Sequence, residues 1–205
     1  MPTIRLVAST YYLSSTTYLS LSDESNMYTN TDSTTFATVE NIVKGTTTCY
    51  LYIRGFNFNA VPANATVTSF TVKLKAYHTG GNTSTSYAPK LCHNTAQLIG
   101  NCSSQLQTSV QTYTFTGLSD TFSDLVEYGS DFGIRINCRR AKNNVTAYFY
   151  IYGAEIEVNY TIPEILYLKV NGEYKACNKI YKKINNVWTE VTLDSLTEPG
   201  VYIKK

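Results

Sequence analysis

The chain has 205 residues, of which 43% are hydrophobic and only 16% charged, and its formal net charge is +2. A charge this close to zero argues against a nucleic-acid partner and against binding to an anionic membrane, because both need concentrated basic charge. The charged share lies well below the roughly 25% usual for soluble domains, and Ser, Thr, Asn and 18 tyrosines take its place. Since Thr and Tyr favour strands, this composition predicts an all-β fold.

The first forty residues are polar with widely spaced apolar positions, which predicts short strands joined by Ser/Thr loops. Residues 1–6 show no basic segment followed by a long apolar core, so we expect neither a signal peptide nor a membrane span. Synthesis in a reducing cytoplasm fits the five cysteines, an odd number without Cys-X-X-Cys spacing. Cys92 and Cys102 bracket a loop and could pair, but free thiols are the favoured interpretation.

The first clear strand covers residues 49–58, and its alternating apolar set changes phase at Gly55. Leu51 and Ile53 lie on one phase before the glycine, and Phe56 lies on the other phase after it. A β-bulge at Gly55 would restore a single buried face, so a bulge is predicted there.

The clearest alternation of apolar and polar residues in the chain follows a proline-containing turn. The side chains expected to face inward are those of Phe70, Val72, Leu74, Ala76 and His78. Residues 79–109 then form a long polar loop, with a short strand expected near Leu91 or Leu98. Long loops on a rigid sheet often carry recognition, although an ordinary mobile loop is the alternative. The candidate glycan-binding or recognition residues of this loop are Tyr87, Lys90, His93 and Asn94.

One short helix is expected over residues 118–128. Ser119 or Asp120 would cap its start and Gly129 would end it. Its apolar residues recur with i, i+3, i+4 spacing, so the helix would cover one end of a sandwich. Strands are expected on either side of it, at residues 113–115 and 132–138.

Residues 147–160 predict the longest strand, and its two halves differ. In the second half, apolar residues alternate with Glu155 and Glu157. The first half is apolar on both phases, because tyrosines fill the positions around Phe149 and Ile151. A strand that is apolar on both faces is expected to be covered on both faces. The candidate interface residues of this strand are Tyr148, Tyr150 and Tyr152.

Pro163 predicts a boundary between a domain at residues 1–162 and an appendage at residues 163–205, because proline blocks strand continuation and stiffens a linker. The appendage repeats one pattern, Lys169-Val170-Asn171-Gly172-Glu173-Tyr174 and then Lys183-Ile184-Asn185-Asn186-Val187-Trp188. Asn-Gly and Asn-Asn pairs suit tight hairpin turns. Two hairpins bury little alone, so they are expected to pack on the main domain or on another protein. Their aromatic anchors are Tyr167, Tyr174 and Trp188.

The residues that catalysis or metal binding requires are missing from the pattern. Only two histidines exist, His78 and His93, and they fall on different elements. No nucleophile elbow, phosphate-binding loop, zinc-protease motif or dinucleotide fingerprint is present. The acidic residues near the predicted helix lack the spacing of a calcium loop. We therefore expect no catalytic residue, no metal site and no cofactor.

A strand, then Ala60-Val61-Pro62-Ala63-Asn64-Ala65-Thr66-Val67, then an alternating strand form one distinctive stretch. A helix followed by Asp131-Phe132-Gly133-Ile134-Arg135-Ile136, and a last strand ending Ile156-Glu157-Val158-Asn159-Tyr160, form another. Both stretches resemble jelly-roll domains of bacteriophage minor structural proteins and of some bacterial carbohydrate-binding modules. The two Asn-turn hairpins look like short modules appended to phage tail and fibre proteins. The resemblance implies an antiparallel, jelly-roll-like β-sandwich with one short helix and a small C-terminal β appendage.

The leading functional hypothesis is therefore a virion structural or assembly protein of a bacteriophage, in the tail, a fibre or the capsid decoration. Such a protein would act through protein–protein contacts with other virion proteins and with copies of itself. The alternative is a carbohydrate-binding module that attaches to a glycan on the host surface through the 79–109 loop. A polysaccharide hydrolase or lyase is a third and weaker hypothesis, because no catalytic group supports it.

Overall fold

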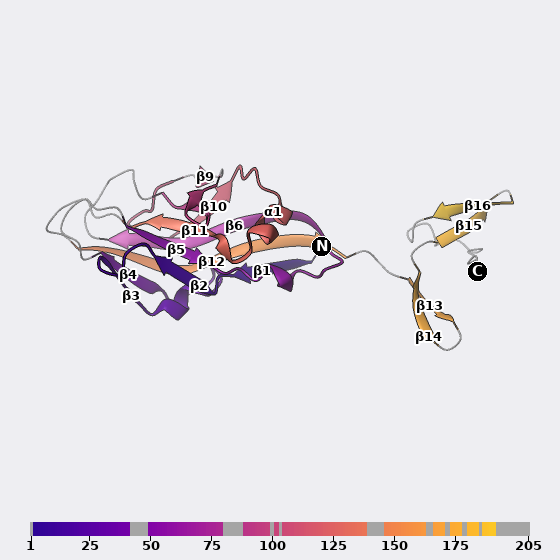
Figure 1. The fold of residues 1–205 in the computed structure, drawn as a ribbon, viewed down its shortest axis with the longest axis horizontal. Coiled ribbons are helices and arrows are strands. Elements are labelled where there is room, and N and C mark those ends of the chain that lie inside the picture. Colours follow the sequence, from indigo (N-terminus) through magenta and orange to yellow (C-terminus); the bar gives the residue numbers. More distant parts are fainter. Residues whose placement is uncertain are drawn as a thin grey trace. The chain divides into compact units, whose positions relative to one another are not determined.

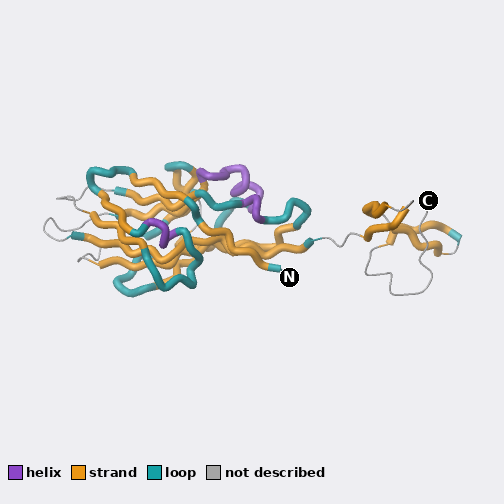
Figure 2. The backbone as a smooth tube through the Cα atoms, turned by 90° about the horizontal axis from the view of Figure 1, so that it is seen from below, coloured by secondary structure: helices purple, strands orange, loops and turns teal. Residues whose placement is uncertain are grey.

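A computed structural model describes residues 2–41, 49–79, 88–98, 101–102, 104–138, 146–162, 166–170, 173–177, 180–184 and 186–191. It divides the chain into two compact units, Met1–Thr161 and Ile162–Lys205. The first unit consists of two antiparallel sheets with short helical segments (Figures 1 and 2). Mostly β structure arranged as a sandwich confirms the predicted fold class.

Sheet A is seven-stranded and runs in the order β3-β4-β12-β6-β10-β9, with β1 also paired to β12. Its strands are β1 (Thr3–Val7), β3 (Leu19–Ser22), β4 (Ala37–Asn41), β6 (Thr66–Thr79), β9 (Asn101–Cys102), β10 (Gln111–Thr116) and β12 (Ala147–Thr161). Sheet B is five-stranded and runs in the order β2-β5-β11-β7-β8. Its strands are β2 (Thr10–Leu13), β5 (Tyr50–Arg54), β7 (Lys90–His93), β8 (Ala96–Gln97) and β11 (Phe132–Asn137). The helical segments are η1 (Glu24–Met27), η2 (Phe58–Ala60), α1 (Phe122–Tyr128) and η4 (Gly129–Asp131).

Eight of these strands follow jelly-roll connectivity, namely β4, β5, β6, β7, β8, β10, β11 and β12. Numbered one to eight along the chain, they give the order 1-8-3-6 in sheet A and 2-7-4-5 in sheet B. Successive strands thus alternate between the sheets for most of the chain, as in the double Greek key of a jelly roll. The remaining strands, β1, β2, β3 and β9, widen the two sheets.

The two longest strands, β6 with 14 residues and β12 with 15, pair with each other along their length. Ile151 pairs with Ala76. Gly153 pairs with Lys75, so Tyr152 has no partner of its own and forms a β-bulge. The extra residue reverses which phase of β12 faces the core. The buried hydrophobic residues of β12 that face the core are accordingly Ala147, Phe149 and Ile151 before the bulge and Ala154, Ile156 and Val158 after it.

The bulge predicted at Gly55 is not present. β5 ends at Arg54, and Gly55 takes the left-handed φ of +76°. A side chain there would meet Ser9 Oγ at 2.6 Å, so the close approach also favours glycine. The chain then leaves the sheet, and Phe56 and Phe58 turn into the core. The change of phase at Gly55 therefore marks the end of a strand, because the following aromatics are buried from a turn.

The helix starts later than predicted, although it ends at the predicted glycine. α1 takes Thr121 as its N-cap, not Ser119 or Asp120. The Thr121 hydroxyl accepts a 3.3 Å hydrogen bond from the backbone N–H of Asp124, and the Asp124 carboxylate accepts one of 2.6 Å from the backbone N–H of Thr121. This reciprocal capping box satisfies two backbone donors at once, which fixes the start of the helix.

Three short strands lie within the stretch 79–109 that was predicted to be mainly a loop. The strand expected near Leu91 is β7, which lies between β11 and β8 in the interior of sheet B. β8 and β9 follow within the same stretch. Leu91 is fully buried in the core, and β7 pairs with β11 on one side and with β8 on the other.

The core lies between the sheets. Its largest fully buried side chains are Phe132, Phe149, Met27, Leu51, Ile53, Leu74, Leu91, Leu125, Ile134, Ile136 and Ile151. The predicted inward set of β6 is confirmed, since Val72, Leu74, Ala76 and His78 are buried and Phe70 is partly buried. Four cysteines are buried free thiols: Cys49, Cys92, Cys102 and Cys138.

The second unit contains two antiparallel hairpins. β13 (Leu166–Val170) pairs with β14 (Glu173–Cys177), and β15 (Ile180–Ile184) pairs with β16 (Val187–Val191). Each hairpin has a two-residue connection, between residues 170 and 173 and between residues 184 and 187. Asn186, in the second connection, has a φ of +65°. Positive φ in a two-residue loop is typical of the primed turns that the Asn-Asn sequence predicted.

The segment after η1 packs over the outer face of sheet A at the bulge. Because Gly153 has no side chain, the backbone carbonyl oxygens of Thr29 and Asn30 occupy the space beside its Cα; an added Cβ would lie 2.6 Å from the Asn30 oxygen and closer still to that of Thr29. The Thr29 hydroxyl donates a 2.8 Å hydrogen bond to the carbonyl of Tyr152. The bulge and the segment above it therefore depend on each other.

A buried carboxylate holds the same segment further along β12. Glu155 is fully buried and accepts hydrogen bonds from the backbone N–H and the hydroxyl of Thr31, at 3.3 and 2.9 Å. Arg5 lies 3.9 Å from this carboxylate and also pairs with Asp32. A buried carboxylate without these partners would be costly, so the network fixes residues 31–32 on the sheet.

The substitution Gly153→Ala tests this packing. We expect it to lower the free energy of unfolding by about 1–3 kcal/mol, because the added methyl overlaps backbone that cannot rotate aside. Chemical denaturation followed by circular dichroism measures the change. Gly117→Ala is the control: its φ is +65° and nothing lies within 4 Å of an added Cβ, so it reports backbone strain alone. A Gly153→Ala chain as stable as the wild type would contradict the packing.

Candidate interaction surfaces

The outer face of sheet A carries a cluster of aromatic rings, which we call the tyrosine surface. It consists of Phe36, Tyr77, Tyr148, Tyr150 and Tyr152, all partly buried. The rings of Tyr77 and Tyr150 stack with centroids 4.4 Å apart and planes 12° apart. Phe36 meets Tyr150 edge-on at 5.2 Å and Tyr152 at 5.3 Å. The rings thus cover much of one another's faces, in the geometries that aromatic pairs prefer.

The predicted interface residues of β12 lie together on this surface. Tyr148, Tyr150 and Tyr152 point away from the core because they alternate with Phe149 and Ile151 before the bulge. Within the first unit they contact one another, Tyr77 and Lys75 on β6, and Phe36. That a second molecule covers them remains a prediction.

The outer face of sheet B carries a second cluster, which we call the Tyr–Arg surface. It consists of Tyr12, Tyr50, Tyr52, Arg54 and Arg135. The Arg54 guanidinium lies 4.8 Å from the ring centroid of Tyr52 and 5.9 Å from that of Tyr12. Arg135 lies 4.8 Å from the ring of Tyr50. Such cation–π contacts are worth about 0.5–1 kcal/mol at exposed sites and more when desolvated.

Both guanidinium groups of the Tyr–Arg surface are held by the turn between β7 and β8. Arg54 donates from Nη2 to the carbonyl of Asn94. Arg135 donates from Nη1 to the carbonyl of Thr95 at 3.2 Å and from Nη2 to Oε1 of Gln97 at 3.4 Å. The arginines are therefore held in place by contacts within the protein, and pre-organisation of this kind reduces the entropy that a surface loses when it binds.

Exposure differs sharply across the Tyr–Arg surface. Tyr52 is only 4% exposed beneath its neighbours, whereas Tyr12 is 50% exposed. The surface thus combines a buried tyrosine, Tyr52, with a half-exposed tyrosine, Tyr12. Well-packed clusters of Tyr and Arg are enriched among the residues that contribute most to binding at protein interfaces.

Sequence reasoning missed the Tyr–Arg surface. Strand register assembles it: Tyr52 on β5 pairs with Tyr12 on β2 and with Arg135 on β11, which puts three strands in one row. A signal was present, because Tyr50, Tyr52 and Arg54 fill the phase opposite Leu51 and Ile53. The alternation of these three residues is visible in the sequence, but the residues of other strands that lie beside them are not.

Three of the four predicted recognition residues lie on or next to β7. Lys90 and His93 are the ends of β7. The ring of His93 stacks on Tyr128 of α1 with centroids 4.2 Å apart. Asn94, with a φ of +56°, donates its N–H to the carbonyl of Asp131 at 2.8 Å. Tyr87 lies outside the described residues.

The appendage anchors lie on its strands. Tyr167 is on β13 and Tyr174 is on β14. Trp188, on β16, pairs across the hairpin with Lys183 and is partly buried.

His78, Asp120 and Tyr128 are titratable groups of the first unit that contact neighbouring side chains. Burial lowers the pKa of His78, which lies beside Phe149. Asp120 accepts a 2.7 Å hydrogen bond from the Tyr128 hydroxyl and raises the pKa of Tyr128 to about 12. Within the part of the chain that the structure describes, no three His, Cys, Asp or Glu side chains gather closely enough to hold a metal ion. No helix among these residues is long and apolar enough to cross a membrane.

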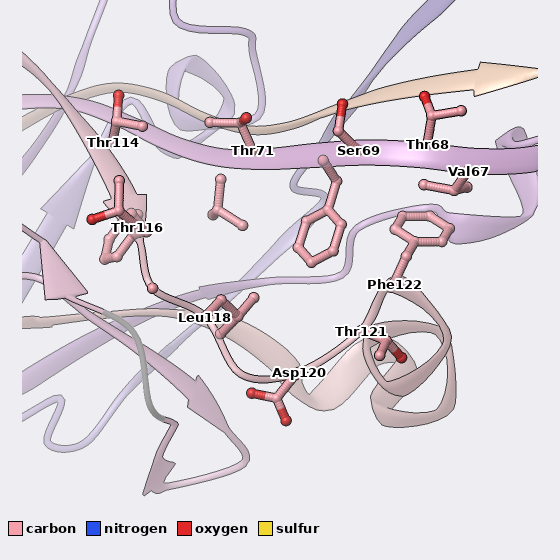
Figure 3. A pocket seen from close by; sticks show the side chains of 14 residues that line it. Val67, Thr68, Ser69, Thr71, Thr114, Thr116, Leu118, Asp120, Thr121 and Phe122 are labelled. Atoms are coloured by element: carbon pink, nitrogen blue, oxygen red, sulfur yellow. The ribbon is translucent and has the colours of Figure 1, made fainter.

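An open groove of about 570 Å³ lies at one end of the sandwich. One wall is the first part of β6, and the other runs from the end of β10 to the start of α1 (Figure 3). Leu118 and Phe122 contribute apolar surface, while threonine hydroxyls from both walls provide polar groups.

Comparisons with protein-family models, curated proteins and solved structures found no match for the chain.

The titration of Cys92 tests whether the residues beneath Arg54 and Arg135 are shielded from water. It is fully buried on the outer side of β7. Burial raises its pKa from 9.0 to about 11, against the opposing effect of the Arg54 and Arg135 charges. The unfolded chain therefore loses this proton near pH 9 and the folded chain near pH 11, so stability that is present below pH 9 falls as the pH rises through 11.

We expect the wild type to lose about 2 kcal/mol more unfolding free energy than Cys92→Ala between pH 8 and pH 11. Urea unfolding at the two pH values measures the difference. The other buried cysteines titrate in both proteins and cancel. Equal losses in the two proteins would show that Cys92 is not held in a desolvated site.

Proposed function

We propose that this protein is a structural component of a bacteriophage particle, in the tail, a fibre or the capsid decoration, and that it works through protein–protein contacts. The observation that carries the contact role is the Tyr–Arg surface. Its arginines are fixed by hydrogen bonds, its base is buried, and Tyr12 remains half exposed. A prearranged patch of this composition matches what protein interfaces select.

The aromatic geometry favours a protein partner over a sugar. Stacking on a sugar ring needs an exposed aromatic face. On the Tyr–Arg surface, guanidinium groups lie over Tyr50 and Tyr52. On the tyrosine surface, Tyr77 covers one face of Tyr150. Both clusters therefore offer ring edges and hydroxyl groups more than free ring faces, which suits the mixed contacts of a protein interface.

The assignment to a phage particle is supported by the combination of elements. A jelly-roll sandwich followed by two Asn-turn hairpins is the arrangement that the sequence resemblance implied for phage structural proteins. A two-stranded hairpin is marginally stable on its own in water. Contact with other proteins of a particle would provide the surface that such hairpins need.

The half-exposed ring of Tyr12 provides the direct test. In a phage that encodes the chain, Tyr12→Ala should reduce the copies per purified particle by at least ~10-fold, the loss expected for an interface anchor worth about 1.4 kcal/mol or more. Quantitative mass spectrometry counts the copies. Tyr18→Ala is the matched control, because Tyr18 is 39% exposed but lies outside the surface. Unchanged incorporation of the Tyr12 variant, or absence of the wild-type chain from particles, would refute the proposal.

The appendage makes a separate contribution. Trp188→Ala should reduce particle incorporation more than it reduces the thermal stability of the isolated protein, because the ring is expected to anchor a partner. Val187→Ala is the control for a neighbouring side chain that is 64% exposed. Melting temperature and copy number are compared for both variants. Equal loss of stability and incorporation would instead place Trp188 in packing within the protein.

A further inference from the structure

Three positively charged side chains meet on the outer face of sheet B. Arg135 of β11 pairs directly with Lys90 of β7, so the two side chains lie on the same face. Arg54 of β5 pairs with Gly133, two residues before Arg135, and is therefore its diagonal neighbour. In antiparallel sheets, Cβ atoms of directly opposite residues lie about 4.5–5.5 Å apart and diagonal neighbours about 7–8 Å apart. We call Arg54, Lys90 and Arg135 the basic cluster.

No carboxylate of the first unit pairs with the basic cluster. The five strands of sheet B contain neither Asp nor Glu. Asp131 immediately precedes β11, but among the described residues the ion pairs involve only Arg5 and Lys73 as cations. The segments of the first unit that lie outside the described residues contain no Asp or Glu in their sequence. The three positive charges therefore have no ion-pair partner within this unit.

The contacts that hold the two arginines do not cancel their charge. Arg54 donates to the carbonyl of Asn94, and Arg135 donates to the carbonyl of Thr95 and to the side-chain amide oxygen of Gln97. All three acceptors are uncharged, as are the tyrosine rings beneath the guanidinium groups. These contacts use one N–H of Arg54 and two of Arg135, and a guanidinium carries five. Donors and positive charge therefore remain for a partner.

The pairing of Lys90 with Arg135 is unfavourable within the isolated chain. Like charges directly opposite each other on neighbouring strands destabilise a sheet. Sheet A shows the usual arrangement, because Lys73 of β6 pairs with the Glu157 carboxylate of β12 at 2.7 Å. A local cost that nothing nearby offsets is expected at functional sites. An anion supplied by a partner would remove this cost.

The spacing of the basic cluster suits carboxylates carried by a polypeptide. Alternate residues of an extended segment lie about 6.6–6.8 Å apart, close to the diagonal separation of Arg54 and Arg135. Guanidinium groups bind carboxylates through paired, charge-assisted hydrogen bonds. Tyr12, which is 50% exposed and lies beside Arg54, offers a ring edge for an uncharged side chain of the same segment.

We propose that the outer face of sheet B binds an acidic segment of a partner protein. Carboxylates at alternate positions of this segment pair with the basic cluster, while a neighbouring uncharged side chain contacts Tyr12. This inference rests on the proposed contact function and names the chemistry of the partner.

Two blocked peptides test for carboxylate recognition: Glu-Thr-Glu-Tyr-Glu-Thr-Glu and its uncharged match, Gln-Thr-Gln-Tyr-Gln-Thr-Gln. Fluorescence anisotropy follows the binding of each labelled peptide to the full chain at low ionic strength. We expect the glutamate peptide to bind at least ~10-fold more tightly than the glutamine peptide. Added salt should weaken its binding, because salt screens exposed charges. Equal binding of the two peptides, or no binding of the glutamate peptide at millimolar concentration, would overturn the proposal.

Removal of single charges locates the binding site. Lys90→Gln and Arg135→Gln should each weaken binding of the glutamate peptide by at least ~3-fold, within the range measured for exposed ion pairs. Lys75→Gln is the matched control, because it removes the same charge from the outer face of sheet A, where Lys75 Nζ lies 5.0 Å from the ring centroid of Tyr152. Equal weakening by Lys75→Gln would show non-specific attraction and refute the site.

Reversal of the Lys90 charge separates binding from folding. Lys90→Glu places a carboxylate opposite Arg135, so it should raise the melting temperature of the isolated protein. The same change should weaken binding of the glutamate peptide by at least ~10-fold, because the new carboxylate occupies and repels. A lower melting temperature together with weaker binding would instead assign Lys90 a role in folding and contradict the proposal.

Polygalacturonate, a polymer of acidic sugars, distinguishes a protein partner from a glycan. Binding of this polymer without binding of the glutamate peptide would overturn the proposal. The Tyr12 test in particles is independent, because it reports whether the surface contacts a partner, whereas the peptides report the charge of that partner. Loss of incorporation by Tyr12→Ala without any peptide binding would refute the acidic segment and leave the contact function standing.

Discussion

β6 and β12 pair along nearly their whole length, and the features of sheet A take their positions from that pairing. The bulge at Tyr152 lets one strand bury Phe149 and Ile151 before it and Ala154 and Ile156 after it. It also directs the tyrosines of β12 to the outer face and places Gly153 under the segment that follows η1. β10 pairs with β6 between Val72 and Ala76, and the groove lies beside the earlier residues of β6.

The outer face of sheet B combines positive charge with tyrosine rings. The chain has few charged residues, and two of its arginines lie over tyrosine rings. The stacked guanidinium groups retain hydrogen bonds to the β7–β8 turn. A guanidinium group can stack on an aromatic ring and still donate hydrogen bonds in its own plane. Each arginine can therefore hold the tyrosine rings in place and form hydrogen bonds at the same time.

The sequence correctly predicted those strands and hairpins whose residue pattern is compatible with only one structure. The alternation from Phe70 to His78 and the Asn-turn hairpins each specify one structure. A change of phase does not: at Gly55 it marks a strand end, and at Tyr152 a bulge, although both look alike in sequence. The N-cap also had several candidates, since Ser119, Asp120 and Thr121 are adjacent.

The candidate surfaces needed information that a single sequence lacks. The tyrosines of β12 were identified because one strand carries them all. The Tyr–Arg surface draws on three strands that are distant in the chain, and only their register brings Tyr12, Tyr52 and Arg135 together. Within residues 79–109 the sequence predicted the short strand near Leu91 but not β8 and β9, because their pairing partners lie on β7 and β10.

Covalent footprinting of tyrosines gives the most direct test of a function based on surface contact. The isolated protein and the protein within purified phage particles are labelled under the same conditions, and the modification of each tyrosine is measured by mass spectrometry. The account predicts that Tyr12 is labelled in the isolated protein and protected in the particle, while Tyr18 is labelled equally in both. Equal labelling of Tyr12 in the two states would contradict it.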